Sequence, residues 1–128
     1  MFETAIPVLQ VRSSVAAEEF YCRRLGFTLL NSWPSADTQA DPRYMALARE
    51  GARLHVHSFQ VAGVGAAAVY VFVDDINSLY AELQSHGVSV AAPPLDQEWG
   101  VRELVARDPD GNVVTFGQRS VASPHAAT

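Results

Sequence analysis

The sequence predicts an α+β fold in which one small unit of a strand, a helix and further strands occurs twice. The first observation is an order of elements that repeats about 60 residues along the chain. In each copy an apolar extended segment leads into a helix-like segment that ends at a glycine, Gly26 and then Gly87. The second observation is that each copy continues with two extended segments around a turn. Because a unit this small cannot bury its apolar face alone, we expect the copies to pack into one pseudo-symmetric domain.

Length and composition fit a single domain with its own core. The chain has 128 residues, of which 48% are hydrophobic, and a chain of this length buries roughly two thirds of its unfolded surface on folding. We place the domain at residues 1–120, with a first module at about 4–60 and a second at about 67–118. Residues 121–128 are expected to form a disordered tail.

The first module begins with a strand and a helix. Residues 6–11 form an apolar extended segment, which is typical of a strand. Residues 15–25 then place apolar and charged side chains at helical spacing. Ser13 and Ser14 precede this segment and can serve as an N-cap, and Gly26 is a natural end.

Two further strands, joined by a tight turn, follow in the first module, and the order leaves room for one more strand in each module. Residues 44–49 and 53–59 are extended in character, and histidines alternate with apolar residues in the second of them. Two segments rich in Pro, Ser or Asp, residues 31–41 and 91–98, are predicted to be loops.

The second module repeats this order. Residues 69–73 form an apolar strand, and residues 76–86 carry an apolar stripe at helical spacing. Residues 102–107 and 113–117 are predicted to be strands on either side of the turn at residues 108–112. That turn contains Pro and Gly at positions that set its backbone angles, so we assign it a structural and not a catalytic role.

Composition excludes several classes of function. The chain has 14 acidic and 9 basic residues, a net charge of −5 and no lysine, so it offers no basic stripe for nucleic acid. No apolar run approaches the ~18 residues of a membrane span, and the first residues lack a signal-like segment. We therefore expect a soluble, cytoplasmic protein, in which Cys22 is a packing residue. The acidic balance is compatible with a cationic small-molecule partner.

Several short motifs, in this order and spacing, resemble the glyoxalase, bleomycin-resistance and extradiol-dioxygenase (vicinal oxygen chelate) superfamily over about residues 4–118, and its bleomycin-resistance branch in particular. The motifs lie at residues 5–9, 19–21, 24–27, 79–82, 97–100, 102–103 and 108–112. The resemblance implies two βαβββ modules that form an incurved mixed sheet around a cleft. It also implies a homodimer in which modules or strands are exchanged between chains.

The metal-dependent members of this superfamily take ligands such as His and Glu from the first strand and a later strand of each module. The matching positions in this chain are Ile6, His55, Ala68 and Thr115, and only the histidine binds a metal well. We therefore expect no cofactor, no bound metal and no catalytic residue. The alternative is a facial triad of His55, His57 and Glu103, because the two histidines are two residues apart on one strand and share a face.

Aromatic residues make up the predicted ligand surface. Tyr70 and Phe72 share a face of one strand, and Trp33 and Trp99 lie in flanking loops. Such rings attract planar or cationic ligands by about 0.5–2 kcal/mol each. In an alternative interpretation, the strand pair belongs to the core and Trp99 packs at a dimer seam. An acidic rim is expected from Asp37, Asp41, Glu50 and Glu98.

These observations predict a metal-independent protein that sequesters a planar, cationic antibiotic of the bleomycin type by stoichiometric capture. The resemblance implies that Trp99 stacks on the ligand, and Tyr44 stands where drug-binding members have a Phe. The candidate ligand-binding residues are Trp99, Tyr70, Phe72, His55, Tyr44, Trp33, Asp41, Arg102 and Thr115. One alternative is a metal-dependent lyase, isomerase or dioxygenase that uses His55 and His57. Another is an accessory protein that shields a biosynthetic intermediate.

Overall fold

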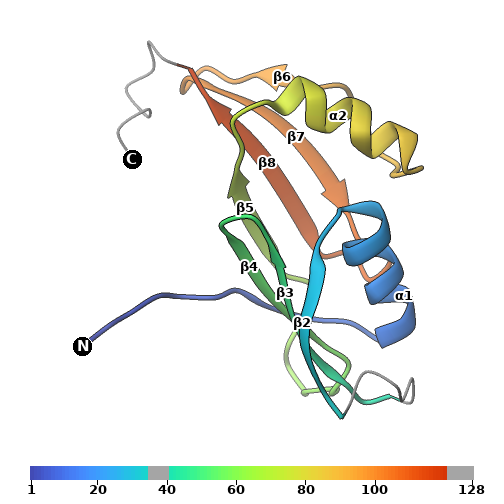
Figure 1. Ribbon diagram of the computed structural model, residues 1–128. Coiled ribbons are helices and arrows are strands. Elements are labelled where there is room, and N and C mark those ends of the chain that lie inside the picture. The colour runs from blue at the N-terminus through green and yellow to red at the C-terminus, as the bar shows by residue number, and fades with distance from the viewer. Residues whose placement is uncertain (35–40, 121–128) are drawn as a thin grey trace. The chain divides into compact units, whose positions relative to one another are not determined.

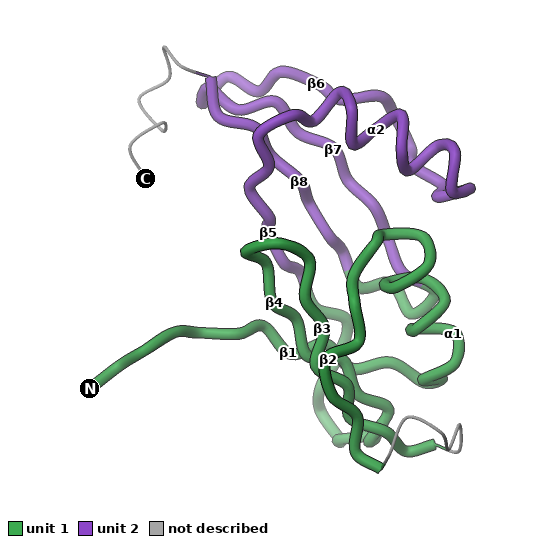
Figure 2. Tube along the Cα trace, in the orientation of Figure 1, with its two compact units in different colours: residues 1–67, 109–112 green, residues 68–108, 113–128 purple. Residues whose placement is uncertain are grey.

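Each half of the chain folds in the order strand, helix, strand, strand, strand (Figure 1). The computed structural model describes residues 1–34 and 41–120, so Asp37 and the predicted tail at 121–128 lie outside the described residues. The chain divides into unit 1, Met1–Ala67 with Pro109–Asn112, and unit 2, Ala68–Asp108 with Val113–Thr128 (Figure 2). The predicted α+β fold with two βαβββ modules is confirmed.

Unit 1 contains one sheet, which we call sheet 1, and one helical segment. Its elements are β1 Val8–Gln10, α1 Ser14–Glu18, η1 Glu19–Arg24, β2 Thr28–Trp33, β3 Tyr44–Arg49 and β4 Ala52–His57. The strand order is β1-β4-β3-β2, in which β1 runs parallel to β4 and the other neighbours are antiparallel. Met45, Leu47, Leu54 and Val56 are buried, because alternate residues of β3 and β4 face the core.

The helical segment of unit 1 matches its predicted extent, but its second half is wider than an α-helix. The N-cap is Ser13, whose Oγ accepts a hydrogen bond from the backbone N–H of Ala16 at 3.1 Å. From Glu19 the segment continues as a π-helix, and it ends before Gly26, which has a φ of 78°. Its side chains Ala17, Phe20 and Tyr21 are buried, whereas Val15 is 46% exposed.

Unit 2 repeats the arrangement with a regular helix over what we call sheet 2. Its elements are β5 Ala68–Phe72, α2 Ile76–Ser85, β6 Leu95–Asp96, β7 Val101–Arg107 and β8 Val113–Arg119, and the strand order is β5-β8-β7-β6. Asp75 caps α2 by accepting a hydrogen bond from Ser78 N–H at 3.1 Å. The predicted apolar stripe of α2, which includes Ile76 and Leu83, is buried, as are Leu104 and Ala106 on β7.

Two strands occur where the sequence indicated loops. β2 extends through Trp33 into the predicted loop at residues 31–41, and it pairs with β3 at the edge of sheet 1. β6 is a two-residue strand inside the predicted loop at residues 91–98, and it pairs with β7. The resemblance implies a third strand of this kind in each module, but the residues do not locate it, because short or exposed edge strands have no alternating apolar pattern.

The turn after β7 contributes its residues 109–112 to unit 1. The Asn112 side chain donates a hydrogen bond to the carbonyl of Gln10 at 3.0 Å and accepts one from Ala67 N–H at 2.8 Å. Asp110 forms an ion pair with Arg12 at 3.0 Å.

Over the described ranges, none of the helices has the length and apolar character needed to cross a membrane.

Candidate ligand-binding faces

Each sheet has a buried face and a second face, which we call the open face. On β4, Leu54 and Val56 are buried whereas His55 and His57 are partly exposed, so the two histidines lie on the open face of sheet 1. On β8, Val114 and Phe116 are buried on the side of α2, and the residues that alternate with them, Thr115, Gly117 and Arg119 among them, belong to the open face of sheet 2.

Tyr70 and Phe72 lie on the open face of sheet 2. They are 42% and 45% exposed, so they are not core residues. Their ring centroids are 4.9 Å apart at an interplanar angle of 56°. The neighbours of these two residues on β8 are Thr115 and Gly117. The rings therefore form a partly exposed aromatic surface on the edge strand of the sheet.

The Tyr70 ring crosses β8 over Gly117 and reaches β7. Its hydroxyl donates a hydrogen bond to Glu103 Oε2 at 2.8 Å. Gly117 makes this path possible, because a Cβ at that position would lie 2.0 Å from the Tyr70 hydroxyl. Desolvation, followed by the hydrogen bond and the charge of Glu103, raises the pKa of Tyr70 to about 12, although Arg119 acts in the opposite direction. Tyr70 is therefore a neutral hydrogen-bond donor at physiological pH.

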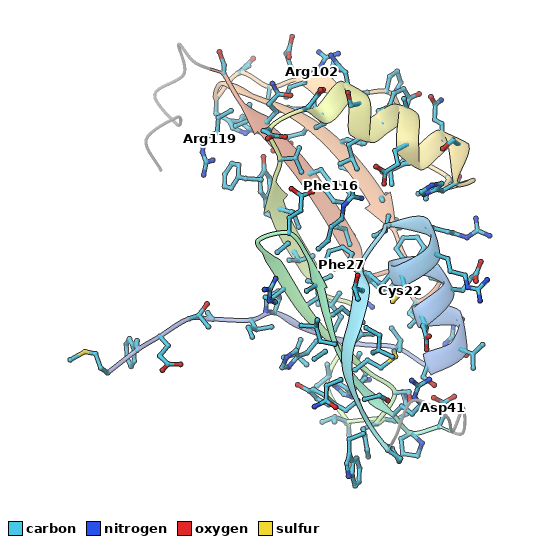
Figure 3. The ribbon with its side chains drawn as sticks, viewed as in Figure 1. Cys22, Phe27, Asp41, Arg102, Phe116 and Arg119 are labelled. Atoms are coloured by element: carbon cyan, nitrogen blue, oxygen red, sulfur yellow. The ribbon has the colours of Figure 1, made fainter. Side chains whose placement is uncertain are left out.

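Phe72 is covered by a cation. The Arg119 guanidinium carbon lies 3.5 Å from the Phe72 ring centroid, a close cation–π contact. Figure 3 shows Arg119 near the end of β8, whereas Arg102 lies near α2. Leu95 pairs with Glu103 and is 62% exposed, so it extends the open face over β6.

Trp99 lies in the tight turn between β6 and β7. The turn is closed by hydrogen bonds from Gly100 N–H to the Gln97 carbonyl at 3.1 Å and from Gln97 N–H to the Val101 carbonyl at 2.8 Å. Trp99 is 49% exposed. The structure thus places this predicted residue on the surface of unit 2, the unit that also holds Tyr70 and Phe72.

The open face of sheet 1 holds a second aromatic group. Trp33 stacks on Phe59 with a centroid distance of 5.9 Å, and His57 stacks on Tyr44 at 5.5 Å. Phe59 and His57 are 6.2 Å apart, which connects the two pairs. Tyr44 also shares a hydrogen bond of 2.9 Å with Nδ1 of His55. Four of the predicted residues, Trp33, Tyr44, His55 and His57, are therefore neighbours, and Phe59 joins them.

The alternative metal triad is not assembled within either unit. His55 and His57 belong to unit 1, and Glu103 belongs to unit 2, where it accepts the hydrogen bond from Tyr70. Within residues 1–34 and 41–120, no three His, Cys, Asp or Glu side chains come together as a metal site would require. Nδ1 of His57 is buried and has no hydrogen-bond partner in the described part of the chain.

Asp41 is placed away from the open face of sheet 1. It accepts hydrogen bonds from Ser14 N–H at 3.0 Å and from Ser58 Oγ at 2.5 Å. Desolvation opposes the effect, but the hydrogen bonds from both serines and the charge of Arg43 together lower its pKa. Asp41 thus anchors the start of α1 and is not positioned as part of an acidic rim.

Arg102 is likewise placed on the face of sheet 2 that carries α2. Its guanidinium donates to Asn77 at 3.2 Å and to Asp96 at 3.1 Å.

Two residues that shape the aromatic surface of sheet 2, Gly117 and Arg119, are not among the candidate residues that the sequence indicated. Strand alternation beyond Gly117 would have placed Arg119 on the face of Phe72, but the predicted strand ended at residue 117.

Comparison with known proteins identifies relatives along the whole domain. A bleomycin resistance protein of Geobacillus stearothermophilus is 25% identical over 134 residues, which cover 90% of this chain and 93% of the relative. The antibiotic-binding protein TnmS3 from Streptomyces sp. CB03234 is 29% identical with a TM-score of 0.69, covering 94% of this chain and 99% of that one. TioX from Micromonospora sp. ML1 has the same fold, with a TM-score of 0.74 at 23% identity and coverage of 94% and 98%.

The family model for the Glyoxalase/Bleomycin resistance protein/Dioxygenase superfamily matches residues 5–116. This range includes both aromatic surfaces and every strand except the end of β8. The chain therefore belongs to the Glyoxalase/Bleomycin resistance protein/Dioxygenase superfamily.

Proposed function

We propose that the protein captures a planar aromatic antibiotic and keeps it from its target by stoichiometric binding. The observation that carries the proposal is the ring pair Tyr70 and Phe72, which is partly exposed on the open face of sheet 2 and held by neighbouring side chains. Large aromatic rings at a surface are favourable when they stack on a partner. A bleomycin resistance protein and an antibiotic-binding protein among the relatives point to the same class of ligand.

The proposed capture needs no cofactor. Its contact groups are aromatic rings, a guanidinium and a neutral tyrosine hydroxyl, which bind by stacking, cation–π contact and hydrogen bonding. The second aromatic group, on the open face of sheet 1, offers rings of the same kind from Trp33 to Tyr44. We assign it to ligand binding as well.

We also propose that the protein acts as a homodimer. Its N-terminal residues extend away from the rest of unit 1 (Figure 1). Met1 and Phe2 are fully exposed there, and Val8 on the edge strand β1 is 47% exposed. Apolar residues of this kind are stabilised by contact with a second chain. Light scattering coupled to size-exclusion chromatography, on the full chain and on a chain lacking residues 1–5, tests this arrangement.

The test of capture is a fluorescence titration with metal-free and Cu²⁺-loaded bleomycin, for which Trp33 and Trp99 serve as reporters. We expect saturable quenching at one ligand per chain. Phe72→Leu should weaken binding about two- to thirteenfold, because stacking on a ring contributes about 0.5–1.5 kcal/mol. Tyr80→Leu removes a ring from α2 instead and should bind as the wild type does. Absence of saturable binding, or an equal loss in both variants, would contradict the proposal.

A further inference from the structure

The open faces carry a charge opposite to that of the whole chain. The chain has a net charge of −5. Assigned by strand alternation, the charged and imidazole side chains on the described open faces are Arg53, His55 and His57 on sheet 1 and Glu103, Arg107 and Arg119 on sheet 2. Arginine therefore outnumbers carboxylate on these faces. The excess acid of the chain is located elsewhere, for example on α2 and just before it, where Asp74, Asp75 and Glu82 occur without an arginine.

The carboxylate on the open face of sheet 2 is already engaged. Glu103 accepts the Tyr70 hydrogen bond at 2.8 Å. The Tyr70 ring reaches it by crossing Gly117, where a Cβ would leave no room for the ring. A ligand cation that approached Glu103 would compete with this hydrogen bond and would meet Arg119, which is close enough to lower the pKa of Tyr70 by its charge.

Arg119 is placed to meet a different kind of ligand. Its guanidinium lies on the Phe72 ring at 3.5 Å. A guanidinium on a ring still presents N–H donors in its own plane, in a fork that fits a carboxylate; because Nε of Arg119 is buried, we assign this role to its terminal nitrogens. Phe72 is 45% exposed in spite of this contact. The same place on the face thus offers a ring for stacking and a cation for an acidic substituent.

We infer that the open face of sheet 2 selects a planar aromatic ligand that carries an anionic group, such as a carboxylate or phenolate, and that Arg119 is the residue that selects it. The inference rests on the proposed capture function and names the chemical class of its ligand. It differs from the cationic ligand expected from the sequence, an expectation that came from the net charge of the chain and from the resemblance to the bleomycin-resistance branch. Arg119 acts by direct contact with the ligand, and Tyr70 acts by occupying Glu103.

The test uses two probes with one ring system and opposite charge, naphthoate and naphthylmethylammonium, titrated by calorimetry into the full-length protein at pH 7. We expect naphthoate to bind more tightly than the cation. Arg119→Gln should weaken naphthoate binding about tenfold, because hydrogen bonds to charged groups are the stronger ones, and should leave the cation unaffected or improved. Arg23→Gln changes the net charge equally, on η1, and should alter neither affinity.

The outcomes separate this inference from the proposed function. If the cation binds more tightly than naphthoate, and binding still depends on Phe72, then capture on this face stands and anion selection is wrong. If Arg119→Gln and Arg23→Gln weaken naphthoate binding equally, Arg119 has no specific role and the inference fails. If neither probe binds the wild-type protein, both the inference and aromatic capture on this face are contradicted. Circular dichroism of Arg119→Gln checks that the variant is folded.

Discussion

A single methyl group at Gly117 tests how the open face of sheet 2 is built. A Cβ there would lie 2.0 Å from the hydroxyl oxygen of Tyr70, 2.6 Å from Cζ and 2.8 Å from Cε1. Side chains do not sustain such contacts, so Gly117→Ala must move the Tyr70 ring off β8. The hydrogen bond to Glu103 is then lost. Gly117 is not among the glycines with positive φ, so the backbone itself accepts alanine.

The expected free-energy changes follow from these two effects. Loss of a hydrogen bond to a charged group costs about 1.5–3 kcal/mol, and the lower value applies because Tyr70 is 42% exposed. Replacing Gly by Ala at a position whose backbone accepts it stabilises the folded state by about 0.4–1 kcal/mol, because the unfolded chain has less conformational freedom to lose. Gly117→Ala should therefore lower the free energy of unfolding by about 1 kcal/mol. In a Tyr70→Ala background it should raise that energy by about 0.5 kcal/mol, a coupling of about 1.5 kcal/mol.

Urea unfolding of the wild type, both single variants and the double variant measures this coupling. Gly51→Ala serves as the matched control, because a Cβ at Gly51 meets no atom within 4 Å, and it should be neutral or slightly stabilising. If the Gly117 and Tyr70 changes are additive within about 0.5 kcal/mol, the ring does not cross Gly117 as described. The reasoning about this face would then be refuted.

Three further outcomes are expected. The pKa of Tyr70 is about 12 in the folded protein and 10.0 ordinarily, so the free energy of unfolding should fall as the pH rises from 10 to 12. Urea unfolding at alkaline pH measures this fall, which should be smaller in Tyr70→Phe. Burial and the charge of Glu18 raise the pKa of Cys22 to about 11, so at pH 8 a thiol reagent should label it about a hundredfold more slowly than in the unfolded chain. Asp41→Asn should lower the free energy of unfolding by about 1 kcal/mol at pH 7. Because the pKa of Asp41 is lowered in the folded protein, the variant should also lose less stability than the wild type as the pH falls below 3.8. An unchanged acid profile would contradict the contacts assigned to Asp41.

Local signals made much of the fold predictable. The helix predicted at residues 76–86 is found at Ile76–Ser85, because its cap and its apolar stripe lie within the segment itself. The strand predicted at residues 44–49 has the same bounds in β3. By contrast, β2 at Thr28–Trp33 is mostly exposed and owes its extended form to pairing with β3. A single sequence does not show such a partner.

The candidate site shows the same division. Alternation along β5 was enough to place Tyr70 and Phe72 on one face, because that relation is local. The role of Gly117 depends on the register between β5 and β8, in which Phe72 pairs with Gly117. Asp41 was assigned to a rim by its charge, yet its partners Ser14 and Ser58 are far from it in the chain. Functional contacts between distant segments were thus the part that sequence reasoning missed.

The partly exposed rings of sheet 2 are held by contacts within unit 2 itself. Tyr70 is fixed by Glu103, and Phe72 is covered by Arg119. A side chain ordered in this way loses less conformational freedom when a ligand stacks on it, and ordering of an interface side chain costs about 0.5–1.5 kcal/mol. Gly117 contributes by giving the Tyr70 ring its path, although it touches no ligand itself. A change at Gly117 should therefore weaken capture through loss of this order, even though every proposed contact residue is still present.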